Sequence, residues 1–272
     1  MTSRPSIKLL ISDVDGTLLT PDKRLAAGTI SAVERLRAAG IRFTIISGRS
    51  ADGLPPLISA LGISEPVGAF NGAQIVWPNL STLEYHTLPP PAARQAMGLL
   101  RQAGVDVWLH DFSHWYVSDL AGAFVARESA TVGHGPHGVW SGAAPPADLI
   151  KITGVSDEPA KLIACEAALR SALGGGLSAS RSQPHYLDIT QFGADKGHGL
   201  RRLAAIMGIE LRQTAAIGDG FNDMPMLSAA GVPLAMGNGA AELRKIARHV
   251  VASNGEDGFA GAVDWLLAGR AG

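Results

Sequence analysis

The chain has 272 residues, of which 46% are hydrophobic and 17% are charged, so it can bury a sizeable core in one large domain or two smaller ones. Its 23 Lys and Arg and 24 Asp and Glu residues give a formal net charge of −1, without a basic block that would follow a phosphate backbone. No apolar run approaches the roughly 18 residues of a membrane span. We therefore do not expect the protein to bind nucleic acid or to insert into a membrane. We expect a cytoplasmic protein without an export signal.

Apolar runs and helical patterns alternate toward both ends of the chain. Such alternation of strand, helix and strand is typical of a parallel α/β sheet. Toward the N-terminus, strands are predicted over 7–12, 41–46 and 67–70, and helices over 30–37 and 54–61. Toward the C-terminus, helices are predicted over 199–207, 224–229 and 240–247, and strands over 214–217 and 232–235.

The middle of the chain has a different texture. Residues 73–190 contain four of the five Trp residues and all three Tyr residues. Two helical patterns in this region, 92–103 and 160–173, are each followed by a strand-like run. We therefore predict an α/β core formed by residues 1–72 and 191–272, with an α+β insert between its two parts.

An acidic pair stands directly behind the first predicted strand. In Asp13-Val14-Asp15-Gly16-Thr17, residues i and i+2 of an extended chain point the same way, so both aspartates face one site while Val14 turns back into the protein. Two carboxylates so close repel each other, which calls for a metal ion or for separate acid and nucleophile roles. Gly16 permits a sharp turn, and Thr17 supplies a hydroxyl and an amide. Ligands of open α/β sheets bind at such strand ends.

Three further polar groups stand next to predicted core elements. Gly218-Asp219-Gly220-Phe221-Asn222-Asp223 follows an apolar strand, and its carboxylates are the hard oxygen ligands that Mg²⁺ prefers. Ser47-Gly48-Arg49 ends the second strand, where a hydroxyl and free amides can hold anionic oxygens. Lys196 stands just before a helix and can neutralise a phosphate. An Asp-x-Asp pair alone favours a simple turn, but four signals in this order favour one catalytic site.

This ordered set of motifs resembles that of the haloacid dehalogenase-like (HAD) superfamily, and in particular its Cof-type hydrolases, which carry an α/β cap between the second and third motifs. The resemblance covers nearly the whole chain and implies a Rossmann-like core with an inserted type IIB cap, here residues 73–190. It also implies a Mg²⁺-dependent phosphatase. Its expected substrates are small phosphorylated metabolites, such as sugar phosphates or phosphorylated cofactors, hydrolysed through an aspartyl-phosphate.

The resemblance also implies a role for each motif residue. Asp13 would attack phosphorus, and Asp15 would protonate the leaving oxygen and later activate the hydrolytic water. Lys196 would balance the charge of nucleophile and phosphate. The implied substrate- or phosphate-binding residues are Thr17, Ser47, Gly48, Asn71 and Asn222. The implied Mg²⁺ site consists of Asp13, the backbone carbonyl of Asp15, Asp219 and Asp223, the last of these acting through water or through Lys196.

Polar residues outside these roles have more than one interpretation. Arg49 either contacts phosphate or pairs with a surface acid. Asp188 alternates as on a strand and is expected to face water. Four histidines of the insert lie at short spacing, but no Cys accompanies them, which favours solvent-exposed or substrate-facing side chains over a second metal site. These histidines are His110, His114, His134 and His137.

The aromatic residues of the insert and the one cysteine favour structural interpretations. Trp108, Trp115, Tyr116 and Trp140 could stack on a sugar or a heterocycle, but such residues more often fill the core of a small domain. Cys165 lies in an apolar helical pattern with no base near it in the sequence, so we predict a buried structural thiol.

Two other functions are compatible with the motifs. Phosphoryl transfer without net hydrolysis, as in phosphomannomutases, would use the same type of core and cap. A binding or regulatory module would keep the fold without the reaction, although inert relatives are expected to lose an acid or the lysine, and all of these groups are present here. The sequence leaves open which metabolite is the substrate and whether the protein is a monomer or a homodimer.

Overall fold

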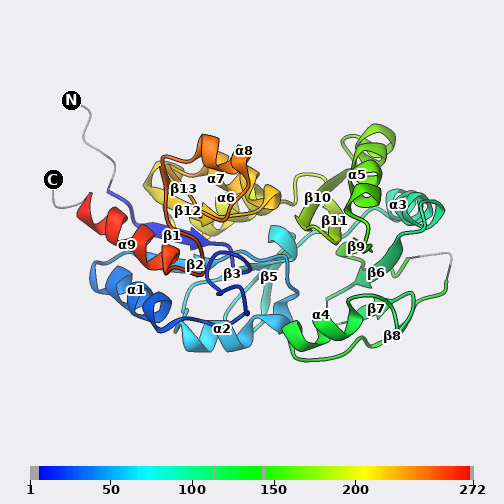
Figure 1. Cartoon of the computed structure of the whole chain (residues 1–272), viewed down its shortest axis with the longest axis horizontal. Helices are drawn as coiled ribbons and strands as arrows, with labels where there is room; N and C mark the ends of the chain where they lie inside the picture. Colours follow the sequence, from blue (N-terminus) through cyan, green and yellow to red (C-terminus); the bar gives the residue numbers. More distant parts are fainter. Residues whose placement is uncertain (1–5, 113, 143–144, 270–272) are drawn as a thin grey trace.

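The computed structural model describes residues 6–112, 114–142 and 145–269. Its elements form two halves along the long axis of the molecule (Figure 1). One half is built on a five-stranded parallel sheet, and the other half on a six-stranded sheet. Within the described ranges, no helix combines the length and the apolar character that crossing a membrane requires.

The parallel sheet has a central strand that is buried on both faces, as predicted. Leu10 of this strand belongs to the core shared by α1 (Ala27–Ala38) and α9 (Gly258–Ala268). Leu9 and Ile11 belong to the core shared by α6 (Lys196–Ile206) and α7 (Met224–Ala229). The sheet order is β14 (His249–Val250), β13 (Val232–Ala235), β12 (Thr214–Gly218), β1 (Leu9–Ser12) and β2 (Arg42–Ile45). The helices around it are α1 (Ala27–Ala38), α2 (Pro55–Ala60), α6 (Lys196–Ile206), α7 (Met224–Ala229), α8 (Ala241–Ile246) and α9 (Gly258–Ala268).

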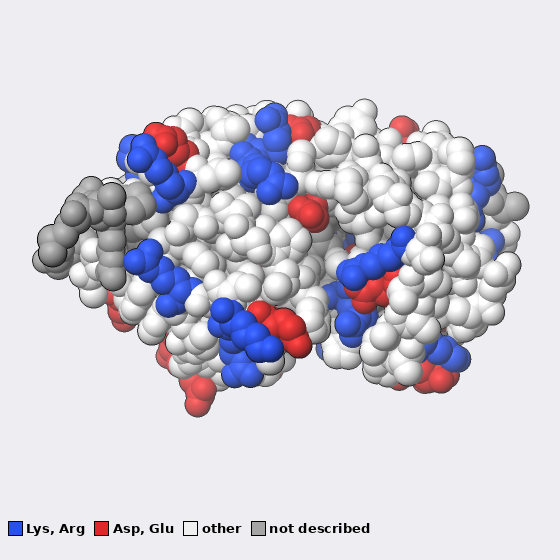
Figure 2. Space-filling view, turned by 90° about the horizontal axis from the view of Figure 1, so that it is seen from above, with Lys and Arg blue, Asp and Glu red and all other residues white. Residues whose placement is uncertain are grey.

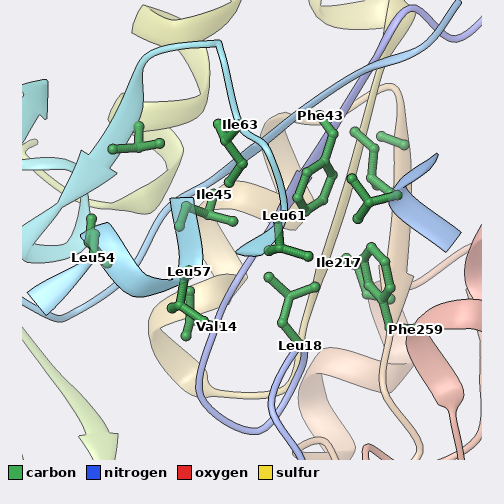
Figure 3. Packing of buried hydrophobic residues seen from close by; sticks show 14 of the residues in the cluster. Val14, Leu18, Phe43, Ile45, Leu54, Leu57, Leu61, Ile63, Ile217 and Phe259 are labelled. Carbon is green, nitrogen blue, oxygen red and sulfur yellow. The ribbon is translucent and has the colours of Figure 1, made fainter. Parts of the chain in front are cut away.

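The residue between the two aspartates of the first motif is part of the hydrophobic core. Val14 is fully buried, and Figure 3 shows it among the side chains that pack beneath the parallel sheet, together with Leu18, Phe43 and Phe259. Full burial of such a side chain contributes about 1.5–3 kcal/mol. This packing fixes the backbone after β1, and the expectation that Val14 turns back into the protein is confirmed.

The third predicted strand differs from the expectation. Residues 67–70 contribute β3 (Val67–Ala69), which joins the parallel sheet through a single bridge between Ile46 and Gly68. The chain then turns back through Phe70, Asn71 and Gly72, all with positive φ. Because of this turn, β3 pairs antiparallel with β4 (Gln74–Val76), which pairs with β5 (Thr82–Tyr85).

The other half is an α+β unit. Its sheet has the order β10 (Leu177–Gln183), β11 (Tyr186–Gln191), β9 (Lys151–Val155), β6 (Asp106–His110), β7 (Trp115–Val117) and β8 (Gly138–Val139), antiparallel except between β7 and β8. The helices α3 (Pro90–Gln102) and α5 (Pro159–Leu173) share one core with this sheet, and Cys165 is buried in it as predicted. Beneath α4 (Val125–Val132), Trp108 and Trp115 fill a second core, in line with their structural interpretation.

Candidate active site

Three neighbouring strands of the parallel sheet bring the separated motifs together. Asp13 follows β1, Ser47 lies two residues beyond the end of β2, and Asp219 follows β12. The strand order places β1 between the other two, and the backbone N–H of Asp13 donates to the carbonyl of Ile217 at 3.0 Å. Parallel strands end on the same edge of a sheet, so residues more than 200 positions apart meet at one site.

Lys196 is a fully buried cation at this site. It is the first residue of α6, so the helix begins three residues earlier than its predicted start at 199. The Nζ of Lys196 donates to Asp13 Oδ1 at 2.5 Å and to Asp223 Oδ1 at 2.6 Å. Burial alone would lower the pKa of this ammonium, but the two carboxylates outweigh burial and raise the pKa above its usual range. Lys196 therefore carries a permanent positive charge beside Asp13.

Asp223 uses both of its oxygens within the protein. Its Oδ1 accepts from Lys196, and its Oδ2 accepts from the backbone N–H groups of Asp219 at 2.9 Å and Gly220 at 2.8 Å. Asp219 is held separately, because the hydroxyl of Thr17 donates to its Oδ1 at 2.9 Å. Asp223 thus positions the loop and the lysine, while Asp13 and Asp219 keep oxygens for a ligand.

The carboxylates of Asp13, Asp219 and Asp223 form a cluster that fits a cation. One oxygen of each lies within 4.8 Å of the others. Burial, followed by the charge of Asp223, raises the pKa of Asp219 to about 6. Burial also raises the pKa of Asp13 well above its usual value. Lys196 lowers this pKa, but the charges of Asp223 and Asp219 raise it and offset part of the effect of Lys196. One lysine does not neutralise these three carboxylates, so they are suitable donors for a divalent cation, and hard oxygens suit Mg²⁺.

Asp15 has cationic partners of its own. The guanidinium of Arg49 donates from Nε to Oδ2 and from Nη2 to Oδ1 of Asp15, both at 2.8 Å, and Lys23 Nζ donates to Oδ1 at 2.6 Å. Burial would raise the pKa of Asp15, but the hydrogen bonds and charges of Arg49 and Lys23 outweigh it and hold the pKa well below its usual range. Of the two interpretations of Arg49, pairing with a surface acid does not apply, because its partner is an acid of the site. Contact of Arg49 with phosphate stays a prediction.

A cavity of about 60 Å³ lies over these groups, between the two halves. Figure 2 shows the surface hollowed between the two halves, with cationic and anionic side chains along the border of the hollow. The core side of the cavity includes Asp13, Asp15 and Gly48, and the six-stranded half contributes Lys151 and Tyr186. Small molecules that enter this cavity contact both halves at once.

Hydrogen bonds close one wall of the cavity. The side-chain amide of Asn71 donates to Asp188 Oδ2 at 2.9 Å and accepts at its own oxygen from Asn222 at 3.0 Å. The Nζ of Lys151 donates to the carbonyl of Gly48 at 2.8 Å. The expectation that Asp188 faces water is wrong, because β11 is an interior strand whose Asp188 points toward the parallel-sheet half and is buried.

Several ionisable groups of the six-stranded half also line the cavity. The hydroxyl of Tyr186 donates to Glu128 Oε2 at 3.1 Å, and burial raises the pKa of Glu128. His110 is buried, and burial together with the charge of Lys151 lowers its pKa well below the usual value, so the ring is neutral. His114, by contrast, is half-exposed and pairs with Asp111. The buried ring of His110 lines the cavity. Of the two predicted environments, solvent-exposed and substrate-facing, only the second is compatible with this position.

Known proteins resemble this chain over nearly its whole length. The profile of a family described as haloacid dehalogenase-like hydrolase matches residues 10–263. The chain belongs to this family. The pyridoxal phosphate phosphatase YbhA of Escherichia coli is 29% identical, over 93% of this chain and 96% of its own length. The 5-amino-6-(5-phospho-D-ribitylamino)uracil phosphatase YitU of Bacillus subtilis is 28% identical, over 93% of this chain and 94% of its own length.

The fold of this HAD-like hydrolase has solved counterparts. The structure of the HAD subclass IIB sugar phosphatase BT4131 matches with a TM-score of 0.84 at 24% identity, over 95% of this chain and 98% of the other. The predicted fold, a parallel α/β core with an α+β unit, is confirmed. Family membership and the relatives named phosphatases also confirm the prediction that the chain is an enzyme of the phosphatase type.

Two predicted phosphate ligands of the hydrolase have protein partners here. The side chains of Thr17 and Ser47 are nearly fully buried, and the hydroxyl of Ser47 accepts from the backbone N–H of Arg49 at 3.2 Å. Their contact with phosphoryl oxygens stays a prediction. Lys23, Glu128 and Lys151 are residues of the site that no motif indicated, because each reaches it only through the tertiary fold.

Proposed function

We propose that this enzyme is a Mg²⁺-dependent phosphatase of small phosphorylated metabolites, with Asp13 as the nucleophile. The arrangement of Asp13 carries the proposal: its carboxyl lies at the end of the central strand, opens on the cavity and is hydrogen-bonded to the buried Lys196. A carboxylate held by a fixed cation is a suitable nucleophile for phosphorus, because the cation also stabilises negative charge on the transferred group.

The proposed reaction has two steps. A carboxylate oxygen of Asp13 forms a bond to phosphorus, the bond from phosphorus to the ester oxygen breaks, and Asp15 donates a proton to that oxygen so that an alcohol leaves. Asp15, now ionised, takes a proton from water as the water oxygen attacks the aspartyl-phosphate, which releases inorganic phosphate and restores Asp13. Lys196 holds its charge beside the transferred group throughout.

Asp15 must change partners before it can serve as the acid. Arg49 and Lys23 keep its pKa low in the present arrangement. Arg49 also lines the cavity. A phosphate dianion in the cavity would attract Arg49 and Lys23 away from Asp15 and so raise the pKa of its carboxyl.

The metal proposal rests on the acidic cluster. Asp13 and Asp219 would hold Mg²⁺ directly together with the backbone carbonyl of Asp15, while Asp223 would act through Lys196. When bound, the ion would supply positive charge to the phosphoryl oxygens and reduce the repulsion between Asp13 and its substrate. Without an ion, Lys196 does not neutralise the negative charge of the three aspartates, as the raised pKa values of Asp13 and Asp219 indicate.

The covered cavity supports the proposed substrate class. The six-stranded half, which corresponds to the predicted insert 73–190 except that β11 ends at Gln191, would act as a cap that admits small molecules and excludes macromolecules. Lys151 supplies a cation there, and YbhA and YitU are named for substrates that are small phosphate monoesters. We place the reaction in the cytoplasm, because charged phosphate esters do not cross membranes unaided.

Hydrolysis of p-nitrophenyl phosphate with Mg²⁺ tests the proposal. Asp13→Asn should abolish turnover while the exposed-site control Asp264→Asn keeps it. Full activity of Asp13→Asn would show that the proposed nucleophile is wrong. A panel of phosphorylated metabolites then tests the substrate class, and an isomerised sugar phosphate without free phosphate would replace hydrolysis by phosphoryl transfer.

A further inference from the structure

A second group of metal-ligating side chains lies outside the cavity. Glu84 belongs to β5, His86 follows that strand directly, and His198 lies in the first turn of α6. Neither histidine belongs to the insert group of closely spaced histidines, and 112 positions separate the two in the sequence. The antiparallel strands β4 and β5 bring the first two residues against α6, with which β4 is in contact.

Three ligand atoms of these residues form a nearly equilateral triangle. His86 Nε2 lies 3.1 Å from Glu84 Oε1 and 3.2 Å from His198 Nε2, and the third side, from His198 Nε2 to Glu84 Oε1, is 3.4 Å. Around a tetrahedral Zn²⁺ with bonds of about 2.0–2.1 Å, neighbouring ligand atoms are about 3.3 Å apart. The triangle therefore has the dimensions of three corners of a zinc site.

Hydrogen bonds alone do not satisfy such a triangle. Each ring nitrogen carries at most one hydrogen and the carboxylate carries none, so at most two of the three sides can hold a hydrogen bond. One cation at the centre would satisfy all three atoms at once. The side chains are 24–29% exposed, so an ion can reach the triangle from solvent and a water can take the fourth position.

The carboxylate of this triangle is already oriented. Arg202, one turn further along α6, donates from Nε to Glu84 Oε2 at 2.8 Å. This bond occupies the oxygen that does not belong to the triangle and leaves Oε1 turned toward the two rings. Outer partners of this kind commonly fix the ligands of metal sites.

We propose that Glu84, His86 and His198 form a zinc site, distinct from the acidic cluster at Asp13. Two imidazoles with one carboxylate suit Zn²⁺ and not Mg²⁺, which prefers oxygen. The ion would tie together the two connections between the halves: His86 begins the connection from β5 to α3, and His198 follows the connection from β11 to α6. The site would therefore act as a clamp at the base of the six-stranded half.

Zinc titration of the full chain tests this site. The protein is stripped with a chelator, kept in millimolar Mg²⁺ to occupy the acidic cluster, and titrated with Zn²⁺ against a colorimetric zinc indicator. We expect each chain to bind one Zn²⁺ ion tightly. His86→Gln and His198→Gln should each weaken binding more than about 100-fold, and Arg202→Gln, behind the ligand, about 10–100-fold.

Two controls separate loss of a ligand from loss of folding. His249→Gln removes a histidine that stacks on Trp265, and it should bind Zn²⁺ like the unchanged protein. Co²⁺ provides a second readout, since a tetrahedral site gives visible absorption that His198→Gln should abolish while thermal unfolding in chelator stays unchanged. Absence of zinc binding by the unchanged chain would overturn the proposal, and so would His86→Gln and His198→Gln variants that bind Zn²⁺ as tightly as the unchanged chain.

Discussion

The side chains of Asn71 and Asp188 are hydrogen-bonded at 2.9 Å although they lie 117 positions apart. Both are buried, Asn71 in the turn after β3 and Asp188 in the interior strand β11. Asp188 also accepts from the hydroxyl of Thr153 at 3.1 Å and lies 3.5 Å from the Nζ of Lys151. One carboxylate therefore joins the parallel-sheet half to the six-stranded half beside the cavity.

Asp188→Ala should weaken this connection between the halves. Asn71 and Thr153 lose a buried acceptor, which typically costs about 1–3 kcal/mol of stability. Urea denaturation measures the change, and we expect a raised KM as well because the cavity loses a wall. Asp264→Ala, which removes an exposed partner of Arg35, should cost less than about 1 kcal/mol. Equal effects of the two substitutions would contradict the assigned role of Asp188.

Asp219→Asn should stabilise the metal-free protein at neutral pH. The folded pKa of about 6 lies above the ordinary value of 3.8, so the folded state holds this proton more tightly and stability falls as pH rises from about 4 to about 6. The amide removes this loss, and above pH 6 the variant in chelator should be more stable by about 1–3 kcal/mol. Below pH 4 the difference should vanish, as thermal unfolding across pH would show.

Mg²⁺ should make the unchanged protein more stable than Asp219→Asn, the reverse of their order in chelator. An ion that binds only the folded state stabilises it by mass action, so Mg²⁺ should raise the melting temperature of the unchanged protein and leave Asp219→Asn almost unaffected. The variant should also lose phosphatase activity. If Mg²⁺ stabilised both proteins equally, Asp219 would not be a ligand of the ion.

The strand-end residues of the site could be predicted from the sequence because local patterns determine them. Asp13 and Asp219 each end an apolar run, and parallel strands necessarily place such ends on one edge. Asp188 shows the limit of this reasoning. Its alternation on a strand is equally compatible with water and with a neighbouring half, and only the docking of the two halves, which local pattern does not encode, decides between them.

Other features were missed for different reasons. The C-terminal helix α9 has apolar residues at helical spacing, Phe259, Ala262, Val263 and Leu266, so its signal was present in the sequence. Lys23 has no such signal, because it reaches Asp15 from a turn in which its own φ is +63°. The triangle around His86 depends equally on tertiary contact, since its third ligand lies on a distant helix.

Arg49→Gln should move the pH dependence of turnover to higher pH. Loss of the two hydrogen bonds and the charge of Arg49 raises the pKa of Asp15. A general acid with a higher pKa keeps its proton to higher pH, so the alkaline limb of kcat/KM, which reports the free enzyme, shifts upward. Lys23→Gln should shift it less, because Lys23 provides one bond and is one-third exposed. An unshifted limb in Arg49→Gln would show that Asp15 is not the acid.

Gly16→Ala should impair metal binding more than folding. Gly16 has φ +90°, and a Cβ at this position would lie 2.3 Å from Asp219 Oδ2, so the carboxylate must leave its present position. Gly40→Ala is the matched control, since Gly40 also has positive φ, +71°, but no described atom lies within 4 Å of its added Cβ. Both variants should lose about 1–2 kcal/mol to left-handed backbone strain. Only Gly16→Ala should need a higher Mg²⁺ concentration for half-maximal hydrolysis of p-nitrophenyl phosphate, and the same requirement in both variants would show that Asp219 tolerates the displacement.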